Sequence, residues 1–508
     1  MFRYGSNGMD SSGHLWPGLK LPDALVRDLL RDNPWWEGKP SKLLPSTRRD
    51  FVELIHRRLE QKLAPIVVVR GPRQVGKTTA QLQVVEDLLG RGVAPQRILR
   101  VQFDELPVLS KLSEPILRVV DWYEHTILRT SLNQAAHDGL PAYLFFDEVQ
   151  NLSDWAVQLK HLVDSSSGYF LVTGSSALRI EAGRDSLAGR INSIEVGTLS
   201  LREIAAIRFN KQLDVALTKN GTDRLGDMEF WRGLKRLGEE QKNTRDLAFE
   251  AFSERGGYPL VHERPDVPWP EVADQLNETV IRRVIQHDLR VGDRGRKRDA
   301  ALLEEVFRLG CRYAGQTPSL ALLVNETQKA LNANVGSQRI RQYLDFLDRA
   351  LLLRLVAPLE IRLKKKKGAP KICLADHGLR ASWLQELIPL APRKLAESPQ
   401  LSDLAGRIAE SVTGICLLTI SGLDLSHFPR REDQEEIDFV ITAGTKRIPV
   451  EVKYRRRVDE RDIAGLTTFL AKDAYNAPFG VLVCEADEAT ISNPRIVQLP
   501  LSSVLLIQ

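Results

Sequence analysis

The sequence predicts an α/β protein whose core is a parallel sheet, followed by a helical region, a winged helix and a second α/β domain. Two observations predict the parallel sheet. From about residue 46 to 200, apolar runs of strand length alternate with helical segments. A glycine-containing turn follows the first of these runs. Such alternation is typical of a parallel sheet that is covered by helices.

The composition indicates an ordinary globular chain of several domains. Its 508 residues exceed what a single core usually accommodates, so we expect roughly three or four domains. The formal net charge of +5 permits a nucleic-acid partner without requiring one. We expect a cytoplasmic protein for three reasons. Its four cysteines are widely spaced, it has no apolar run of membrane-spanning length, and its N-terminus lacks an apolar signal core.

The apolar runs place the elements of the first half of the chain. We expect residues 1–45 to form an irregular arm, in which Trp35 and Trp36 pack onto the next domain rather than stack on a base. Residues 46–200 form the sheet domain, and residues 201–299 are mostly helical and end in a charged linker. The expected strands are residues 66–69, 98–103, 142–146, 169–174 and 191–196.

The pattern changes in the second half. Residues 300–385 contain three helical segments, the third capped by Ser337 and extending to residue 356, and then a basic hairpin-like stretch. Together these describe a winged helix. Residues 386–508 form a terminal α/β block, with short strands at residues 425–430, 436–442, 447–454 and 479–486.

The turn after the first apolar run has the pattern G-x-x-x-x-G-K-[ST]. Its glycines let successive backbone N–H groups point at phosphate oxygens, and the following helix presents its positive end. A strand–turn–helix that matches by chance is the alternative, which the flanking strand and helix make rare. The predicted ATP-binding residues are Gly71, Pro72, Arg73, Gln74, Val75, Gly76, Lys77, Thr78 and Thr79, with Lys77 on the β- and γ-phosphates and Thr78 on Mg²⁺.

Two acids end the apolar run at residues 143–146. We expect Asp147 to complete the Mg²⁺ shell and Glu148 to activate the attacking water, a pairing that favours hydrolysis over mere binding. A strand that simply ends in solvated acids is the alternative. The position of Lys77 upstream of this strand favours the catalytic interpretation.

Two further residues are candidates for the same reaction. Thr173 ends the next strand, where a polar side chain can orient the hydrolytic water, although a plain strand exit would look the same. Arg190 can neutralise charge on the transferred phosphoryl group, from its own subunit or a neighbour. An ordinary surface arginine is an equal alternative for Arg190.

Four motifs in order, GPRQVGKTT, FFDEVQ, LVTGSS and SLAGR, resemble the prokaryotic AAA-type P-loop ATPases that carry a C-terminal domain of uncharacterised function. The resemblance continues through GGYP, YLDFLDRALLL, KICLADHGLR and EIDFV…IPVEVKY, so it spans nearly everything after residue 45. It implies an AAA-like core with a helical lid at residues 201–299, a winged helix and a restriction-endonuclease-like C-terminal domain. It also implies active sites at subunit borders, and hence a homo-oligomeric ring, expected to be a hexamer.

A second group of charged residues lies in the terminal block. Asp438, Glu451 and Lys453 fit the pattern D-x₁₂-E-x-K on two strands, and Glu410 in the preceding helix is a natural additional ligand. Strand alternation puts Glu451 and Lys453 on one face. Two carboxylates could bind Mg²⁺ against a scissile phosphate, as in the PD-(D/E)xK nucleases that this block resembles. An inactive fold that serves as a binding module is the alternative.

Basic residues around both C-terminal regions suggest a DNA partner. A ring of arginines fits a phosphodiester backbone better than a neutral substrate, although each could be a solvated surface charge. Winged helices also serve as protein docking modules. The candidate DNA contacts are Arg339 and Arg341 in the third helix, Lys364, Lys365, Lys366 and Lys367 in the wing, and Arg455, Arg456 and Arg457 in the terminal block.

These residues together predict a Mg²⁺-dependent ATPase that binds DNA and uses hydrolysis to remodel, translocate on or process it, with a possible nuclease activity. The alternative is a nucleotide-gated regulatory or adaptor switch whose nuclease-like domain only binds nucleic acid or protein.

Overall fold

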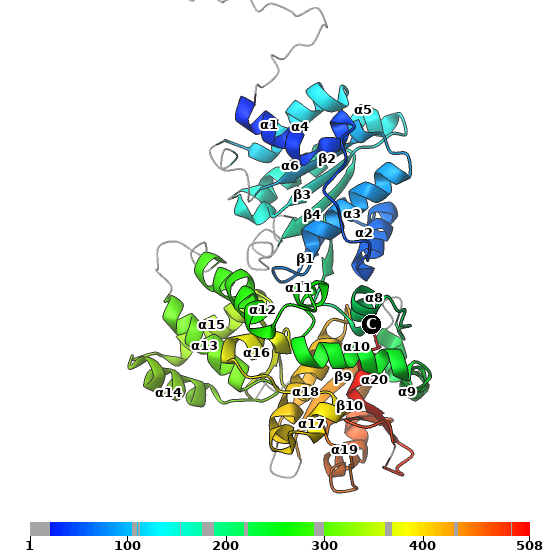
Figure 1. Ribbon diagram of the computed structural model, residues 1–508, viewed down its shortest axis with the longest axis vertical. Helices are drawn as coiled ribbons and strands as arrows, with labels where there is room; N and C mark the ends of the chain where they lie inside the picture. Colours follow the sequence, from blue (N-terminus) through cyan, green and yellow to red (C-terminus); the bar gives the residue numbers. More distant parts are fainter. Residues whose placement is uncertain are drawn as a thin grey trace, which may run out of the picture. The chain divides into compact units, whose positions relative to one another are not determined.

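The computed structural model describes residues 21–103, 109, 112–152, 154–174, 187–217, 222–288, 299–360, 368–430, 435–488 and 490–508. The chain divides into two compact units, the first containing most of the residues up to 194 and the second most of those that follow. Figure 1 shows both units and labels many of their elements. Among the described helices, none is both long and apolar enough to cross a membrane.

The first unit is built on the predicted five-stranded sheet. Its strand order is β2-β3-β4-β1-β5, so most strands that neighbour each other in the sheet are separated by a helical crossover. Strands β1, β2, β3 and β4 pair in parallel, which places their carboxyl ends at one edge. The strands are β1 Ile66–Arg70, β2 Ile98–Gln102, β3 Tyr143–Asp147, β4 Tyr169–Gly174 and β5 Ile191–Glu195.

Helices cover both faces of this sheet, as predicted for an α/β core (Figure 1). Side chains alternate along β1, so that Ile66 and Val68 join the apolar core under α1, α4 and α6. Helices α2 and α3 cover the opposite face; α2 contacts β1 and β4, and α3 contacts β4. The helices and short turns of this unit are α1 Asp23–Asp32, η1 Pro34–Glu37, α2 Asp50–Gln61, α3 Lys77–Gly90, η2 Pro95–Arg97, α4 Pro115–Tyr123, η4 Glu124–Leu128, α5 Leu132–His137, η5 Val149–Asn151 and α6 Trp155–Ser165.

The expected irregular arm is partly wrong, because residues 23–32 form helix α1. Leu25 and Leu29 lie one helical turn apart and are fully buried in the core of the first unit. The packing of the two tryptophans is confirmed, since the indole N–H groups of Trp35 and Trp36 both donate to the carbonyl of Ile98, at 3.1 and 2.8 Å. The described part of the arm therefore belongs to the sheet domain.

The second unit contains the remaining helices and two sheets. Helix α8 begins with a capping box, in which Ser200 and Glu203 satisfy each other's backbone N–H groups. The elements outside the winged helix and the sheets are α8 Leu201–Phe209, η6 Thr222–Gly226, α9 Met228–Glu240, α10 Lys242–Arg255, α11 Pro259–Glu263, α12 Trp269–Leu276, η7 Asn277–Arg282, η8 Val284–Asp288, α16 His377–Leu384, α17 Pro392–Ala396, η9 Pro399–Leu401, α18 Ser402–Leu418, α19 Ala464–Leu470, η10 Asp473–Tyr475 and α20 Leu501–Val504.

Three helices and a two-stranded antiparallel sheet form at the predicted winged helix. Two details differ from the prediction. Ser337 is the first helical residue and Gly336 takes the cap position, and the third helix ends at Arg349 because Leu351 adopts a φ of 57°. The elements are α13 Ala300–Arg312, α14 Leu320–Leu331, α15 Ser337–Arg349, β6 Leu353–Val356 and β7 Lys371–Leu374.

The terminal block is a mixed five-stranded sheet of order β12-β11-β10-β9-β8. Strands β10, β11 and β12 are parallel, whereas β8, β9 and β10 form an antiparallel meander. One face packs against α18, and α19 covers the other. The strands are β8 Asp424–Phe428, β9 Ile437–Ala443, β10 Lys446–Val452, β11 Gly480–Cys484 and β12 Ile496–Pro500.

The helices that were expected to form a lid share a core with this terminal sheet. Buried side chains of α8, α9 and α10 lie in one apolar cluster with those of α18, β9, β10, β11 and β12. The backbone adds to the junction, because the N–H groups of Ala216 and Leu217 donate to the carbonyls of Leu506 and Ile507, both at 2.9 Å. Helices α8 to α10 are therefore part of the C-terminal core as well.

The buried position of α1 generates a prediction for stability. We expect Leu29→Ala to lower the free energy of unfolding of the first unit by about 2–5 kcal/mol, because the change removes apolar contacts and leaves a cavity. Leu43→Ala is the matched control, since Leu43 is 94% exposed and its truncation should cost less than about 0.5 kcal/mol. Urea unfolding followed by tryptophan fluorescence measures both. Equal stability of the two variants would contradict the assignment of α1 to the core.

Candidate functional site

The phosphate-binding loop connects β1 to α3, and its backbone has the conformation that the glycine pattern predicts. Gln74 and Gly76 adopt φ values of 62° and 89°, in the left-handed region that turns successive N–H groups to one side. Gly71 must be a glycine, because a Cβ there would lie 2.5 Å from the carbonyl oxygen of Val196. Helix α3 begins at Lys77, so Lys77, Thr78 and Thr79 form its first turn.

The Asp147 carboxylate is the point at which the predicted catalytic residues meet. It ends β3 and is fully buried. The Thr78 hydroxyl donates to its Oδ2 at 2.8 Å, and the Thr173 hydroxyl, from the end of β4, donates to its Oδ1. The parallel sheet therefore brings Thr78, Asp147 and Thr173 together from three separate segments of the chain.

A buried arginine completes this group, and the sequence analysis missed it. The Arg100 Nη2 lies 3.1 Å from the Oδ2 of Asp147, and the Arg100 side chain is 5% exposed. Its guanidinium also donates to the side-chain oxygens of Gln81, at 2.9 Å, and Gln102, at 2.8 Å. The signal was present in the sequence, since an arginine stands in the middle of the otherwise apolar part of β2 and a buried guanidinium requires an acid.

The two other predicted catalytic residues also have protein partners. Glu148 adopts a φ of 53°, unusual for a non-glycine residue, and its Oε2 accepts a hydrogen bond from the amide of Gln150. Arg190 forms a two-point ion pair with Asp164, at 2.6 and 3.0 Å. This hydrogen bond lowers the pKa of Asp164 and raises that of Arg190. A role of Arg190 on phosphate would therefore require the pair to open.

The residues around Asp147 fit the Mg²⁺ that the ATPase prediction implies. The Thr78 hydroxyl and the Asp147 carboxylate are hydrogen-bonded, and both supply oxygen ligands of the kind that Mg²⁺ prefers. The ammonium of Lys77 stands at the start of the same helix, where a phosphate would bind. This donor set matches a Mg²⁺–nucleotide complex.

The second predicted group also comes together, at strands β9 and β10 of the terminal sheet and helix α18. Val450 on β10 pairs with Phe439 on β9, which brings the neighbouring Asp438 and Glu451 side by side. The backbone N–H of Asp438 donates to the Oε2 of Glu451 at 3.4 Å, and the Lys453 Nζ lies 2.6 Å from its Oε1. The predicted alternation is confirmed, since Val450 and Val452 lie in the apolar core of the opposite face.

A lysine that the sequence analysis did not consider lies among these acids. The Nζ of Lys371, on β7, is 2.6 Å from Asp438, 3.2 Å from Glu410 and 3.5 Å from Glu436. We call Lys371, Glu410, Asp438, Glu451 and Lys453 the lysine–carboxylate cluster. Among the described residues, no group of three or more His, Cys, Asp or Glu side chains is arranged to hold a metal ion. The cluster as it stands does not fit the predicted nuclease Mg²⁺.

Burial controls the electrostatics of this cluster. It raises the pKa of Glu451 to about 8, with the Asp438 carboxylate adding to the effect. Burial and Asp438 likewise raise the pKa of Glu410 well above its ordinary value. Burial acts on Asp438 in the same direction, but the Lys371 ammonium outweighs it and holds the pKa of Asp438 below its usual range. Asp438 and Lys371 are thus the charged pair at the centre of the cluster.

The candidate DNA contacts remain predictions, and the structure places most of them at the surface. Arg339 and Arg341 are exposed in the first turns of α15. Arg455, Arg456 and Arg457 are exposed after β10, where the Nη2 of Arg455 lies 2.8 Å from Asp462. Lys364, Lys365, Lys366 and Lys367 lie outside the described residues.

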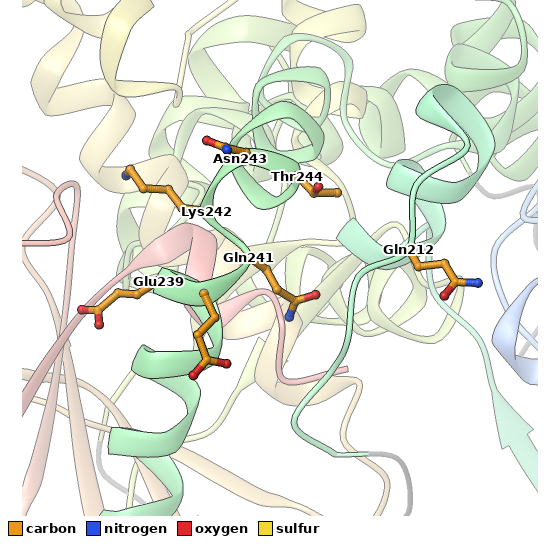
Figure 2. A pocket seen from close by; sticks show the side chains of 7 residues that line it. Gln212, Glu239, Gln241, Lys242, Asn243 and Thr244 are labelled. Carbon is orange, nitrogen blue, oxygen red and sulfur yellow. The ribbon is translucent and has the colours of Figure 1, made fainter.

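A polar hollow of about 360 Å³ lies at the turn between α9 and α10, apart from every predicted site residue. Its lining side chains spread outward rather than converge on one point, with Glu239 and Lys242 far from Gln212 (Figure 2). We therefore assign it no binding role. It is lined by Gln212, Glu239, Glu240, Gln241, Lys242, Asn243 and Thr244.

Comparisons with protein families match three parts of the chain. Residues 63–205 match the family described as an AAA domain, which covers the phosphate-binding loop, Asp147 and Thr173. Residues 247–387 and 405–504 each match a domain of unknown function. The first unit thus has the AAA-type P-loop fold that its motifs predict. The match over residues 405–504 covers most of the lysine–carboxylate cluster.

Similar proteins extend the match over most of the chain. An uncharacterized protein of Mycobacterium tuberculosis is 25% identical over 414 residues, which is 80% of this chain and 74% of that protein. One of Haemophilus influenzae is 22% identical over 323 residues, 62% of this chain and 68% of its own length. The similarity therefore includes both units.

Among solved structures, similarity is found with a DNA replication initiation factor and with Aquifex aeolicus DnaA bound to AMPPCP. Each is 13% identical, with a TM-score of 0.23. The first match covers 62% of this chain and 96% of that structure, and the second covers 60% and 89%.

The buried partner of Asp147 generates a prediction. We expect Arg100→Met to lower the free energy of unfolding by about 3–5 kcal/mol, because it leaves a buried carboxylate without its guanidinium. The double variant Arg100→Met, Asp147→Asn should regain most of this stability, since a neutral amide needs no counter-charge, but it should remain inactive. Urea unfolding and ATP turnover measure the two effects.

Arg91→Met is the control for this prediction, because it removes an exposed arginine that pairs with Glu60 at 3.2 Å. An exposed pair of this kind contributes only about 0–1 kcal/mol. If Arg100→Met cost no more than Arg91→Met, the buried ion pair would have no role in holding Asp147.

Proposed function

We propose that this protein is a Mg²⁺-dependent ATPase that acts on DNA. The observation that supports hydrolysis most directly is the meeting of Thr78, Thr173 and Arg100 on the buried Asp147, at the carboxyl edge of a P-loop sheet. A binding site alone would not need an acid held in this way next to a second acid, Glu148.

Each residue has a separate role in this proposal. The loop from Gly71 to Gly76 binds phosphates through its backbone, Lys77 contacts the β- and γ-phosphates, and Thr78 and Asp147 hold the metal. Mg²⁺, when bound, neutralises charge on the phosphate oxygens. Glu148 takes a proton from the attacking water. Thr173, which is hydrogen-bonded to Asp147, fixes the orientation of that carboxylate as well as lining the site.

DNA is the partner that the second unit fits best. The third helix of a winged helix is the element that usually contacts DNA, and here its first turns carry Arg339 and Arg341 in exposed positions. Such arginines would contact phosphates and position the duplex without reading its sequence. We also propose that the chain assembles as a ring, in which Arg190 of one subunit could leave Asp164 and contact the nucleotide of a neighbour.

A nucleotide-gated adaptor switch is the second candidate, because the lysine–carboxylate cluster does not have the geometry of a metal-dependent nuclease. The two functions differ in their response to DNA. A motor hydrolyses ATP faster when DNA is added, whereas a switch turns over at the same rate with or without it.

Lys77→Ala and Glu148→Gln separate nucleotide binding from the chemical step. Lys77→Ala should lose ATP binding and hydrolysis together, because the loop loses its only side-chain contact to the phosphates in this scheme. Glu148→Gln should still bind ATP but hydrolyse it about 10²–10⁴-fold more slowly, since the amide cannot accept the proton. Fluorescent-nucleotide binding and phosphate release measure the two steps. Glu60→Gln, at an exposed acid of α2, is the control. A fully active Lys77→Ala protein would end the proposal.

The two exposed arginines of α15 allow a test of DNA binding. Arg339→Ala, Arg341→Ala should weaken binding to all duplexes alike and reduce the slope of log K against log salt concentration by about 2. Arg232→Ala, Arg236→Ala removes two exposed arginines from α9 and is the matched control. Fluorescence anisotropy at several salt concentrations measures both. Identical slopes for the two variants would show that α15 does not contact DNA.

A further inference from the structure

Lys371 lies among the acids that the nuclease pattern would use as metal ligands. Its Nζ approaches Asp438, Glu410 and Glu436 at 2.6, 3.2 and 3.5 Å, and its side chain is 1% exposed. Three carboxylates from α18, the segment before β9 and β9 itself therefore surround one buried ammonium. A fully buried lysine is rare in proteins unless acids neutralise it, as they do here.

The oxygens of the two central acids already have protein donors. The Oδ1 of Asp438 contacts Lys371, and its Oδ2 accepts the backbone N–H of Val452 at 2.9 Å. The Oε1 of Glu451 contacts Lys453 at 2.6 Å, and its Oε2 faces the N–H of Asp438. Ligands of Mg²⁺ must instead converge on one point at about 2.1 Å. These oxygens point at four different donors.

The backbone of β7 is held by its neighbours, which fixes the Cα of Lys371 beside the acids. Lys371 pairs with Val356 on β6, and the next residue, Ile372, exchanges backbone hydrogen bonds with Gly315 and Gln316 at 2.8 and 2.9 Å. The N–H of Leu374 donates to the Ser411 hydroxyl at 2.8 Å. Displacing the ammonium would leave a buried positive charge without its acids, which is strongly destabilising.

The packing around the cluster is equally close. A Cβ on Gly414 of α18 would lie 2.6 Å from the Sγ of Cys373 on β7 and 2.7 Å from the ring of Phe439 on β9. The glycine thus lets α18 approach both strands, so that Glu410, one turn earlier on the same helix, reaches Lys371. The cluster joins β7 of the winged helix to α18 and β9 of the terminal domain.

We infer that the Lys371 ammonium is the permanent counter-ion of this carboxylate cluster and occupies the position of the nuclease metal. The cluster is a metal-free ionic junction between the winged helix and the terminal domain, and Asp438 does not support metal-dependent cleavage of DNA. This inference is independent of the ATPase, whose residues lie in other elements.

The test is Mn²⁺ binding to the full-length protein without nucleotide, measured by electron paramagnetic resonance. Wild type and Asp438→Asn should give the same binding curve, because Asp438 holds no metal. Their DNA cleavage with Mn²⁺ should also be the same. A Mn²⁺ site or a cleavage activity of the wild type that Asp438→Asn removes would overturn the inference.

A second variant tests the place of the ammonium. Lys371→Met should create a Mn²⁺ site at least tenfold tighter than any in wild type, and adding Asp438→Asn should abolish it. Lys329→Met, at an exposed lysine of α14, is the matched control and should gain no site. A folded Lys371→Met protein that gains no site would overturn the inference. If that variant does not fold, the comparison of wild type with Asp438→Asn still decides the question.

Discussion

The cost of burying charge governs both charged centres of this protein. In the first unit, Asp147 is fully buried, and Thr78, Thr173 and Arg100 all donate to its carboxylate, which offsets the cost of removing it from water. These donors come from α3, β4 and β2. The sheet order β2-β3-β4-β1-β5 places β3 between β2 and β4, so each of those donors lies on an adjacent strand or on the helix that follows β1. The position of Asp147 therefore depends on the correct register of the whole sheet.

The same constraint explains the terminal domain, with a different outcome. There the buried acid Asp438 receives its compensation from a lysine of another element rather than from a ligand. Here the ammonium of Lys371 contacts three carboxylates, and the close approach of α18 at Gly414 keeps Glu410 among them. The residue pattern thus resembles that of nucleases, whereas the arrangement of these side chains does not suit a metal ion.

The sequence was sufficient for the parts of the structure that depend on local pattern. The five strands of the first sheet, the phosphate-binding loop and the shared face of Glu451 and Lys453 all follow from period and spacing along the chain. The partners Arg100 and Lys371 could not be found in that way, because each meets its acid only after distant strands pair. Arg100 did carry a signal, a lone charge within a buried strand. Lys371 carried none that separates it from the run of lysines that precedes it in the sequence. Helix α1 was missed because its two buried leucines stand between stretches rich in glycine and proline.

The shared core of the second unit has a consequence for how the protein is made. Helices α8 to α10 pack on strands that lie some 200 residues later, and Ala216 and Leu217 find their backbone partners only at Leu506 and Ile507. On the ribosome, where synthesis proceeds at about 5–20 residues per second, these helices emerge many seconds before the surface that covers them. Their apolar faces stay exposed until the strands between residues 437 and 500 have been synthesised. The second unit is therefore a late and slow folder, with the long-range contacts that delay folding in general. The sheet of the first unit, by contrast, has all its strands available once residue 195 has left the ribosome.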